Sequence, residues 1–335
     1  MGNPLVSIIV PTFNRPDSLR AVLESLEQQS HRDFEVIVIE GGDFTAAQKA
    51  AATSEVVFPF KVLEQKTRAG LAAAVNEGVV ASRGELIIRT DDDVEFAPDW
   101  LREICRSFED PQVGGVTGPT IIPADRQSYR DLLSGYEKFR RGNLFWRAVG
   151  KIYFDYFLEG RSLEVASWFR CGAFSLGANF EEALQLESPI EVDYLHACNL
   201  AVRRSLLEEV GGFNEVYQGT AEYNEAEVAF KLRRRGYKLI FNPQAYVYHL
   251  VSRSGVYAAR ANSCERMKNF VYFYLNNIKP DTPDKALRFS TYLMCNSAFW
   301  VFKFFRTGNW RQLGGIAAIF ISFWNAGWKR KEYRC

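Results

Sequence analysis

The N-terminal third of the chain alternates between two kinds of hydrophobic pattern. Short apolar runs at 6–10, 34–39 and 85–90 have the length and the β-branched content of buried strands. Between them, residues 17–29 and 69–81 place apolar side chains at helical spacing. Strands that alternate with helices are typical of a mainly parallel sheet with helices on its faces. The sequence therefore predicts an α/β fold with a Rossmann-like sheet.

Three adjacent aspartates, Asp91, Asp92 and Asp93, follow the third of these strands. In an α/β sheet, ligands bind just outside the carboxyl ends of the strands. Carboxylate oxygens suit the hard cations Mg²⁺ and Mn²⁺, which usually arrive holding the phosphates of a substrate. A solvated acidic turn is the alternative for three such residues in isolation. Their position at a strand end favours a metal site for a phosphate-bearing substrate.

The same kinds of pattern continue beyond the aspartates. They predict strands at 114–122 and 238–241 and helices at 98–108, 205–210 and 226–235. Between them, residues 124–190 are rich in aromatic side chains but have no clean period. We expect this stretch to be an inserted, partly helical region.

Composition excludes some classes of function. With 335 residues, the chain is long enough for one large domain or two small ones. Its 41 basic and 40 acidic side chains give a net charge of +1, so nothing points to a nucleic acid partner. The six cysteines are scattered without metal-ligand spacing, and the N-terminus lacks the pattern of a secretory signal. A reducing, cytoplasmic location is expected.

The C-terminal tail differs in kind from the rest of the chain. Residues 286–335 contain eight basic residues and one acidic residue among many Phe and Trp side chains. The longest uninterrupted apolar run, 316–321, is far shorter than the ~20 residues needed to span a bilayer. Basic, aromatic amphipathic helices are typical of segments that lie in a membrane interface. The alternative is a helical subdomain that packs its aromatic side chains on the rest of the chain or on a second subunit of a homo-oligomer.

Four segments, read together, resemble the family 2 glycosyltransferases, enzymes of the GT-A fold that move a sugar from a nucleotide sugar to an acceptor. The resemblance spans roughly residues 5–250. The first segment contains Pro11, Thr12, Asn14 and Arg15 and looks like the family's first strand and nucleotide-binding turn.

The second of the four segments also resembles a nucleotide-binding part of the family. Glu40 stands where the family usually has an Asp that accepts a hydrogen bond from the base. Gly70 and Asn76 belong to a segment similar to the helix that precedes the family's metal-binding strand. Many relatives have Arg where this chain has Val75, so one diphosphate contact is missing.

The third segment contains the three adjacent aspartates, which look like the family's Asp-x-Asp motif. The resemblance places Asp91 and Asp92 near the ribose and the diphosphate, and makes Asp93 the first choice for a metal ligand, with Asp91 beside it. His249 ends a predicted strand, as in many relatives, where it can complete the metal or diphosphate site. The implied cofactor is Mn²⁺ or Mg²⁺, which would stabilise the charge of the leaving nucleoside diphosphate. A structural role is the alternative for His249.

The fourth segment, 193–214 with the helix that follows it, resembles the family's acceptor-side half. Asp193 and His196 are the candidate acceptor contacts in it, although a packed core histidine explains His196 equally well.

An acidic pair at the start of that helix supplies the catalytic base in the family. Counted back from Gly236, Glu225 falls on the base position and Glu227 on the acidic residue two positions further on. Asn224 replaces a common Glu. Glu222 and Glu227 remain alternatives for the base.

The sequence thus predicts an inverting, metal-dependent glycosyltransferase. Residues 1–255 would form the GT-A catalytic domain, with 124–190 as an inserted acceptor-side region, and 256–335 the helical tail at the inner face of the cell membrane. The expected donor is a UDP-sugar, or else a GDP-sugar, and the expected acceptor is a saccharide or a lipid-linked acceptor. The alternatives are an enzyme like the sugar-nucleotide pyrophosphorylases and a catalytically silent binding protein with the same fold.

Overall fold

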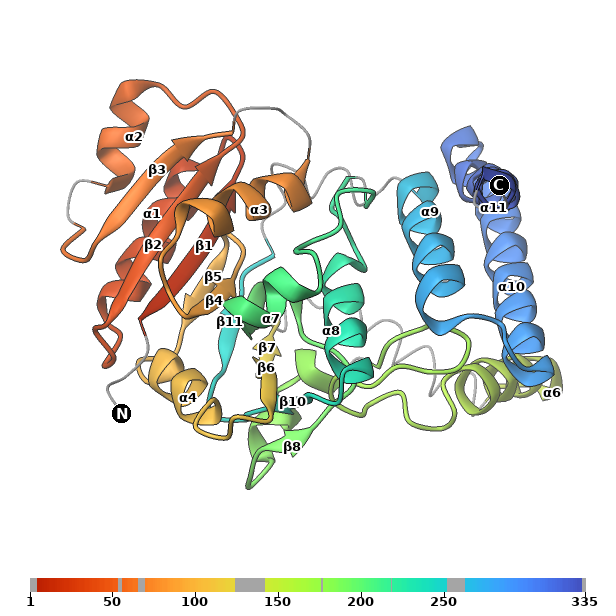
Figure 1. Ribbon diagram of the computed structural model, residues 1–335. Helices are drawn as coiled ribbons and strands as arrows, with labels where there is room; N and C mark the ends of the chain where they lie inside the picture. The colour runs from red at the N-terminus through yellow and green to blue at the C-terminus, as the bar shows by residue number, and fades with distance from the viewer. Residues whose placement is uncertain are drawn as a thin grey trace.

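The computed structural model describes residues 5–53, 56–65, 70–123, 142–175, 177–217, 219–251 and 263–332. In this part of the chain, eight strands form one central sheet (Figure 1). In spatial order they are β3 (Phe60–Glu64), β2 (Phe34–Glu40), β1 (Val6–Thr12), β4 (Leu86–Arg89), β9 (Leu200–Arg203), β6 (Val113–Thr117), β10 (Lys238–Phe241) and β8 (Ile190–Glu191).

Most neighbours in this sheet are parallel. β1 lies between β2 and β4 and pairs with both in parallel, with Val6 opposite Phe34 and Leu86. β9 is an exception because it runs antiparallel to β4 on one side and to β6 on the other. Because β1 and β4 are parallel, their carboxyl ends lie at the same edge of the sheet, where Thr12 ends β1 and Asp91 comes just after β4.

Helices cover both faces of the sheet. They are α1 (Pro16–Glu27), α2 (Ala46–Thr53), α3 (Leu71–Ala81), α4 (Trp100–Ser107), α7 (Arg204–Glu209) and α8 (Asn224–Arg234). Alternate residues of β1 point to opposite faces, as in any strand. Ile8 packs in the cluster that contains α1 and α4, whereas Ile9 packs in the cluster that contains α3, α7 and α8. This two-sided burial explains why the strands read as continuous apolar runs.

A second, small sheet positions part of the site. It consists of β5 (Val94–Phe96), β11 (Val247–His249) and β7 (Thr120–Ile121). β11 runs antiparallel to β5 and places His249 opposite Val94, the residue after Asp93. The end of β11 is thereby brought to the turn that leaves β4.

The region predicted as an insertion is partly helical where the structure describes it. It contains α6 (Leu144–Gly150), the π-helix η2 (Lys151–Phe157) and the short 3₁₀ helices η3 (Gly177–Asn179) and η4 (Glu181–Gln185). A further 3₁₀ turn, η5 (Ala197–Asn199), leads into β9. Residues 124–141 of the predicted insertion lie outside the described residues.

The C-terminal part of the chain is helical, as predicted. It consists of α9 (Ser263–Phe273), the π-helix η7 (Tyr274–Ile278), α10 (Pro283–Thr307), η8 (Trp310–Leu313) and α11 (Gly314–Glu332). Figure 1 shows these helices at the end of the molecule opposite β1 to β3. Tyr274 stacks on Phe289 with ring centroids 3.8 Å apart, which joins η7 to α10. No helix among the described residues is both long enough and apolar enough to cross a membrane.

The predicted α/β fold class with a mainly parallel sheet and a helical extension is confirmed. The pattern at 114–122, read as one strand, is two strands, β6 and β7, separated at Gly118 and Pro119. The backbone packs closely there, since a Cβ on Gly118 would lie 2.0 Å from the carbonyl oxygen of Ala245. The domain boundary at residue 255 stays a prediction because 252–262 lie outside the described residues.

Candidate functional site

A cavity of about 310 Å³ lies at the carboxyl ends of β1 and β4. Its walls come from the turn after β1, the turn after β4, the start of α3, the segment before α8 and the end of β11. The predicted site residues among its lining are Pro11, Thr12, Arg15, Gly70, Asp91, Asp92, Asp93, Glu225 and His249. Segments far apart in the sequence thus share one cavity at the predicted edge of the sheet.

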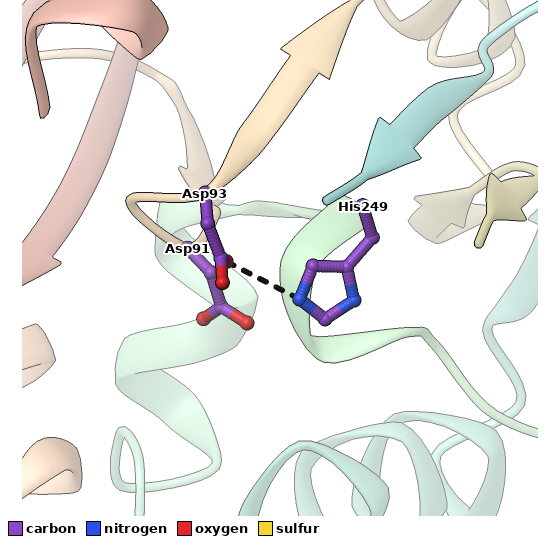
Figure 2. A group of neighbouring side chains, drawn as sticks. All are labelled: Asp91, Asp93 and His249. Carbon is purple, nitrogen blue, oxygen red and sulfur yellow. Dashed lines mark ion pairs between the residues drawn. The ribbon is translucent and has the colours of Figure 1, made fainter. Parts of the chain in front are cut away.

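Asp91, Asp93 and His249 form a cluster that could hold a metal ion (Figure 2). Each offers one ligand atom, and these atoms all lie within 4.8 Å of one another. The Nε2 atom of His249 lies 3.2 Å from a carboxylate oxygen of Asp93. These are the three residues that the sequence proposes as metal ligands.

The donor set fits a divalent cation. Two carboxylates and an imidazole converge, and Asp93 also contacts the guanidinium of Arg15 at 3.2 Å. Burial lowers the pKa of His249, but its contacts with Cys198 and Asp93 outweigh burial, so its pKa lies well above the ordinary value. A bound cation would reverse this shift because imidazole binds metals in its neutral form. Without a metal ion, the guanidinium of Arg15 and the protonated imidazole of His249 supply the positive charge that a bound cation would otherwise supply to Asp93.

Asp92 is held differently from its two neighbours. Its carboxylate is buried, accepts a hydrogen bond from the Thr12 hydroxyl at 2.6 Å and forms an ion pair with Arg15. Burial raises the pKa of Asp92 to about 7, against the opposing effects of Arg15 and Thr12. Asp92 therefore ties the turn after β1 to the turn after β4, as well as lining the cavity.

Two residues proposed for nucleotide binding are absent from the described lining of the cavity. The side chain of Asn14, a residue with φ of 53°, accepts a hydrogen bond from the backbone N–H of Asp43 at 2.8 Å. Glu40 is buried and accepts one from the backbone N–H of Gly42 at 2.6 Å. Both shape the loop after β2, and Gly41 of that loop does line the cavity.

Asn76 of α3 also lies away from the described cavity lining. Its side chain accepts a hydrogen bond from the backbone N–H of Phe213 at 3.0 Å and donates to the carbonyl of the same residue at 2.8 Å. It thereby fixes the segment between α7 and α8 against α3. Sequence spacing gives no signal of such a contact because the partners lie far apart in the chain.

The two candidate acceptor contacts are likewise absent from the described lining. Asp193 forms an ion pair with Arg233 of α8 and accepts a hydrogen bond from the backbone N–H of Trp168. His196 lies 3.4 Å from the Tyr194 hydroxyl, and burial lowers its pKa to about 4. His196 is therefore neutral at physiological pH, which is consistent with a packed histidine.

Glu225 reaches the cavity from the first turn of α8. Its side chain is 17% exposed, and its Oε2 atom lies 3.7 Å from the guanidinium of Arg89. Burial raises the pKa of Glu225, and Arg89 acts in the opposite direction. A partly desolvated carboxylate with a raised pKa is suited to accept a proton near neutral pH.

Glu227 points elsewhere, although it lies only two residues further on. It is buried, accepts hydrogen bonds from Tyr217 (2.6 Å) and Asn277 (3.3 Å), and forms an ion pair with Lys231 (2.8 Å). Burial raises its pKa, but Lys231 and Tyr217 outweigh burial, so the net shift is downward. Glu227 therefore joins α8 to η7 and is not among the described residues that line the cavity.

Two further residues of the cavity carry charge. Glu222, the other candidate base, lines the cavity, but it forms an ion pair with Arg266 of α9 at 2.8 Å. Arg89 is the last residue of β4 and was not singled out from the sequence. A charged residue inside an otherwise apolar strand was the signal that could have identified it.

Comparison with known proteins agrees with this geometry. The sequence of this chain matches the family model for glycosyl transferase family 2 over residues 7–211. The O-antigen biosynthesis protein RfbC of Myxococcus xanthus is 26% identical over 257 residues, which is 76% of this chain and 18% of that protein. The chain spans a quarter or less of the length of the first curated relatives that it matches.

Two solved structures share the fold. One is the mannosyltransferase PcManGT from Pyrobaculum calidifontis in complex with GDP-Man and Mn²⁺, with a TM-score of 0.54, 21% identity, and coverage of 97% of this chain and 88% of that one. The other is GalNAc-T7 with UDP, GalNAc and Mn²⁺, with a TM-score of 0.56, 16% identity, and coverage of 84% and 52%. At these identities the likeness establishes the fold.

Proposed function

Because the chain belongs to glycosyl transferase family 2, we propose that it moves a sugar from a nucleoside-diphosphate sugar to a saccharide or lipid-linked acceptor, with inversion at the anomeric carbon. One observation supports this proposal above the others. Asp91 to Asp93, on the leaving-group side, and Glu225, on the proposed acceptor side, line the same cavity.

The proposed reaction is a single displacement. Glu225 takes the proton of an acceptor hydroxyl while that oxygen forms a bond to the anomeric carbon. The bond between the anomeric carbon and the phosphate oxygen breaks, and its electron pair leaves with the nucleoside diphosphate. Glu225 suits the role of base because it lines the cavity, whereas Glu227 is held by Tyr217, Asn277 and Lys231.

We propose that Asp91, Asp93 and His249 hold a divalent cation, Mn²⁺ or Mg²⁺. When bound, the cation would supply positive charge to the departing diphosphate. Arg15, which contacts Asp92 and Asp93, would bind a phosphate oxygen of the donor. Thr12, Gly70 and the loop at Gly41 would surround the nucleoside.

For the donor we propose a UDP-sugar ahead of a GDP-sugar. The solved structures that share the fold carry GDP-Man in one case and UDP in the other, both with Mn²⁺, which supports a nucleoside-diphosphate donor of either kind. The test is a thermal-shift panel of UDP, GDP and CDP sugars, each with and without Mn²⁺. Stabilisation by one nucleotide only when metal is present supports the proposal. Equal stabilisation with EDTA contradicts the metal dependence.

Two variants separate the enzyme from the alternatives. With the stabilising donor and a panel of saccharide and lipid-linked acceptors, Asp93→Ala and Glu225→Gln should both lose glycoside formation. A catalytically silent protein would bind the donor and form no glycoside in the wild type. An enzyme like the sugar-nucleotide pyrophosphorylases would instead make the nucleotide sugar from a nucleoside triphosphate and a sugar phosphate, and that activity in the wild type would refute transfer.

We further propose that the acceptor is reached at the inner face of the cell membrane, where α10 and α11 lie in the interface. Phe305 and Trp310 are 79% and 73% exposed, and Phe302, Phe320 and Trp324 are also strongly exposed. Such an accumulation of exposed aromatic side chains is rare on a monomer surface. Lys303 and Arg306 alternate with the aromatic residues on α10, a charge pattern that suits anionic lipid headgroups.

Vesicle flotation tests the membrane contact. The full chain should float with vesicles that contain anionic phospholipid, and the double variant Lys303→Glu, Arg306→Glu should float much less. Arg102→Glu, an exposed change on α4, is the matched control and should float like the wild type. If the wild type stays unbound and sediments as a dimer, the exposed face is instead an interface between two copies of the chain.

A further inference from the structure

We propose that Arg89 is a positioning residue for Glu225, acting through a direct charge contact and through Asn224. This inference rests on the proposed function, in which Glu225 takes the proton of the acceptor hydroxyl. Nothing in the sequence resemblance assigns a role to Arg89, which enters only through the geometry of the cavity.

Arg89 is buried at the end of β4, where its guanidinium is held on several sides. Its side chain is 2% exposed. Its Nη1 atom donates a hydrogen bond to Oδ1 of Asn224 at 3.0 Å and lies 3.7 Å from Oε2 of Glu225. The guanidinium carbon lies 5.9 Å from the ring centroid of Phe213. The rigid strand thus fixes a positive charge beside the first turn of α8.

The contact between Arg89 and Glu225 is close enough for electrostatic attraction but too long for a hydrogen bond. At 3.7 Å the attraction between the two groups is strong, whereas hydrogen bonds between nitrogen and oxygen are about 2.7–3.2 Å long. In the described part of the chain, Oε2 of Glu225 has no hydrogen-bond partner. Oε2 is itself a buried atom, so Arg89 orients the carboxylate from its buried side, through charge and without a hydrogen bond.

Asn224 holds the guanidinium of Arg89 by a hydrogen bond without neutralising its charge. It is fully buried, and its carbonyl oxygen accepts from Arg89 while its Nδ2 atom has no hydrogen-bond partner among the described residues. A carboxylate at position 224 would meet the guanidinium directly and compensate its charge. With an amide there, the positive charge of Arg89 acts mainly on Glu225.

Two acidic side chains oppose the ionisation of Glu225. Glu222 precedes it in the chain, and Asp91 faces it from the turn after β4, and both disfavour its ionised form. Arg89 opposes them. An opposite charge at this distance lowers a carboxyl pKa by about 1–3 units. Arg89 thus keeps Glu225 ionised at a pH where its burial and the two acids would otherwise protonate it.

The test compares Arg89→Met and Arg89→Lys with the wild type. In Arg89→Met, kcat should fall about 100-fold because a small misplacement of a reacting group costs about that much. The acid limb of the kcat profile should move upward by about one pH unit. Arg89→Lys keeps the charge, so it should restore the position of the limb and only part of kcat. The KM for the donor and the stabilisation by donor with Mn²⁺ should change little in both variants.

Arg203→Met is the matched control. Arg203 is a partly buried arginine of β9 that donates to the backbone carbonyls of Val113 and Phe108, away from the cavity. Equal losses of kcat in Arg89→Met and Arg203→Met, without movement of the acid limb, would show a purely structural role and overturn the proposal. So would a kcat within twofold of the wild type in Arg89→Met.

Asn224→Asp gives a second test that does not depend on removing the arginine. The change is isosteric, so folding should be retained, and the new carboxylate should divert the charge of Arg89. The acid limb should again move upward, and an unmoved limb contradicts the inference. Glu225→Gln distinguishes this failure from failure of the proposed function. If Glu225→Gln keeps full transfer, the base assignment is wrong whatever Arg89 does.

Discussion

Exchanging each of two neighbouring glutamates of α8 for glutamine should have opposite consequences. Glu225 lines the cavity, with a carboxylate oxygen that accepts no hydrogen bond among the described residues. Glu227 is buried in a network with Tyr217, Asn277 and Lys231. Since both changes replace a carboxylate by an amide of the same shape, the comparison separates the chemical role of the carboxylate from its structural role.

For Glu225→Gln we expect loss of rate without loss of stability. Removing a general base costs a factor of about 10²–10⁴ in kcat, or about 3–5 kcal/mol of transition-state stabilisation. The pKa of Glu225 is raised in the folded state, so its ionised form opposes folding above the unfolded pKa. The neutral amide removes that cost, and Tm should stay the same or rise.

For Glu227→Gln we expect loss of stability without loss of kcat. The pKa of Glu227 is lowered in the folded state, so its ionised form adds stability above the unfolded pKa, and this stability is lost as pH falls through the folded pKa. The hydrogen bonds to its charged form are each worth about 1.5–3 kcal/mol, and glutamine keeps only part of them. A net loss of about 2–3 kcal/mol should lower Tm by roughly 3–4 °C.

The assay is kcat for glycoside formation with saturating donor and Mn²⁺, measured beside thermal unfolding of the same preparations. It is done well below the Tm of each variant, so that partial unfolding does not enter the rate. If Glu227→Gln loses more than tenfold in kcat at unchanged Tm, the base has been assigned to the wrong residue. If both variants lose rate and stability together, the two side chains do not have separate roles.

Three further predictions follow from the same structure. Because burial raises the pKa of Glu225 and the base must be ionised, kcat should fall with decreasing pH through a pKa above the ordinary value of 4.5, and a limb at that value would argue against Glu225. His249→Ala should raise the Mn²⁺ concentration for half-maximal thermal stabilisation with donor at least about tenfold, and an unchanged midpoint would remove His249 from the ligand set. Phe289→Ala should destabilise the chain by about 3–5 kcal/mol in thermal or urea unfolding because Phe289 is buried against Tyr274, whereas the exposed control Phe302→Ala should stay within about 0.5 kcal/mol. Equal effects of the last two would mean that α10 is not docked on η7.

Much of the fold could be predicted because its strands are buried on both faces and its helices are amphipathic. The runs at 6–10 and 34–39 became β1 and β2, and the helix predicted at 17–29 became α1. β9 was not predicted as a strand, and its place between β4 and β6 is set by tertiary pairing with strands that lie far from it in the chain.

The candidate site could be predicted in part for a related physical reason. Residues at the carboxyl ends of β1 and β4, or just after them, share one edge of the sheet, so Thr12, Arg15 and Asp91 lie together as expected from their position. Glu225 and Glu227 are only two residues apart, yet the side chain of Glu225 lines the cavity and that of Glu227 accepts a hydrogen bond from Tyr217. Which of them reaches the cavity depends on the segments that pack against α8. Such long-range contacts leave no periodic trace in the sequence.

The antiparallel strand β9 has a consequence for how such a chain can change during evolution. It carries residues 200–203 into the middle of a sheet in which β1 to β4 come from the N-terminal third of the chain. A recombination that replaces the chain after β6 must therefore bring in a strand that pairs with both β4 and β6, because their unpaired edges would otherwise invite aggregation.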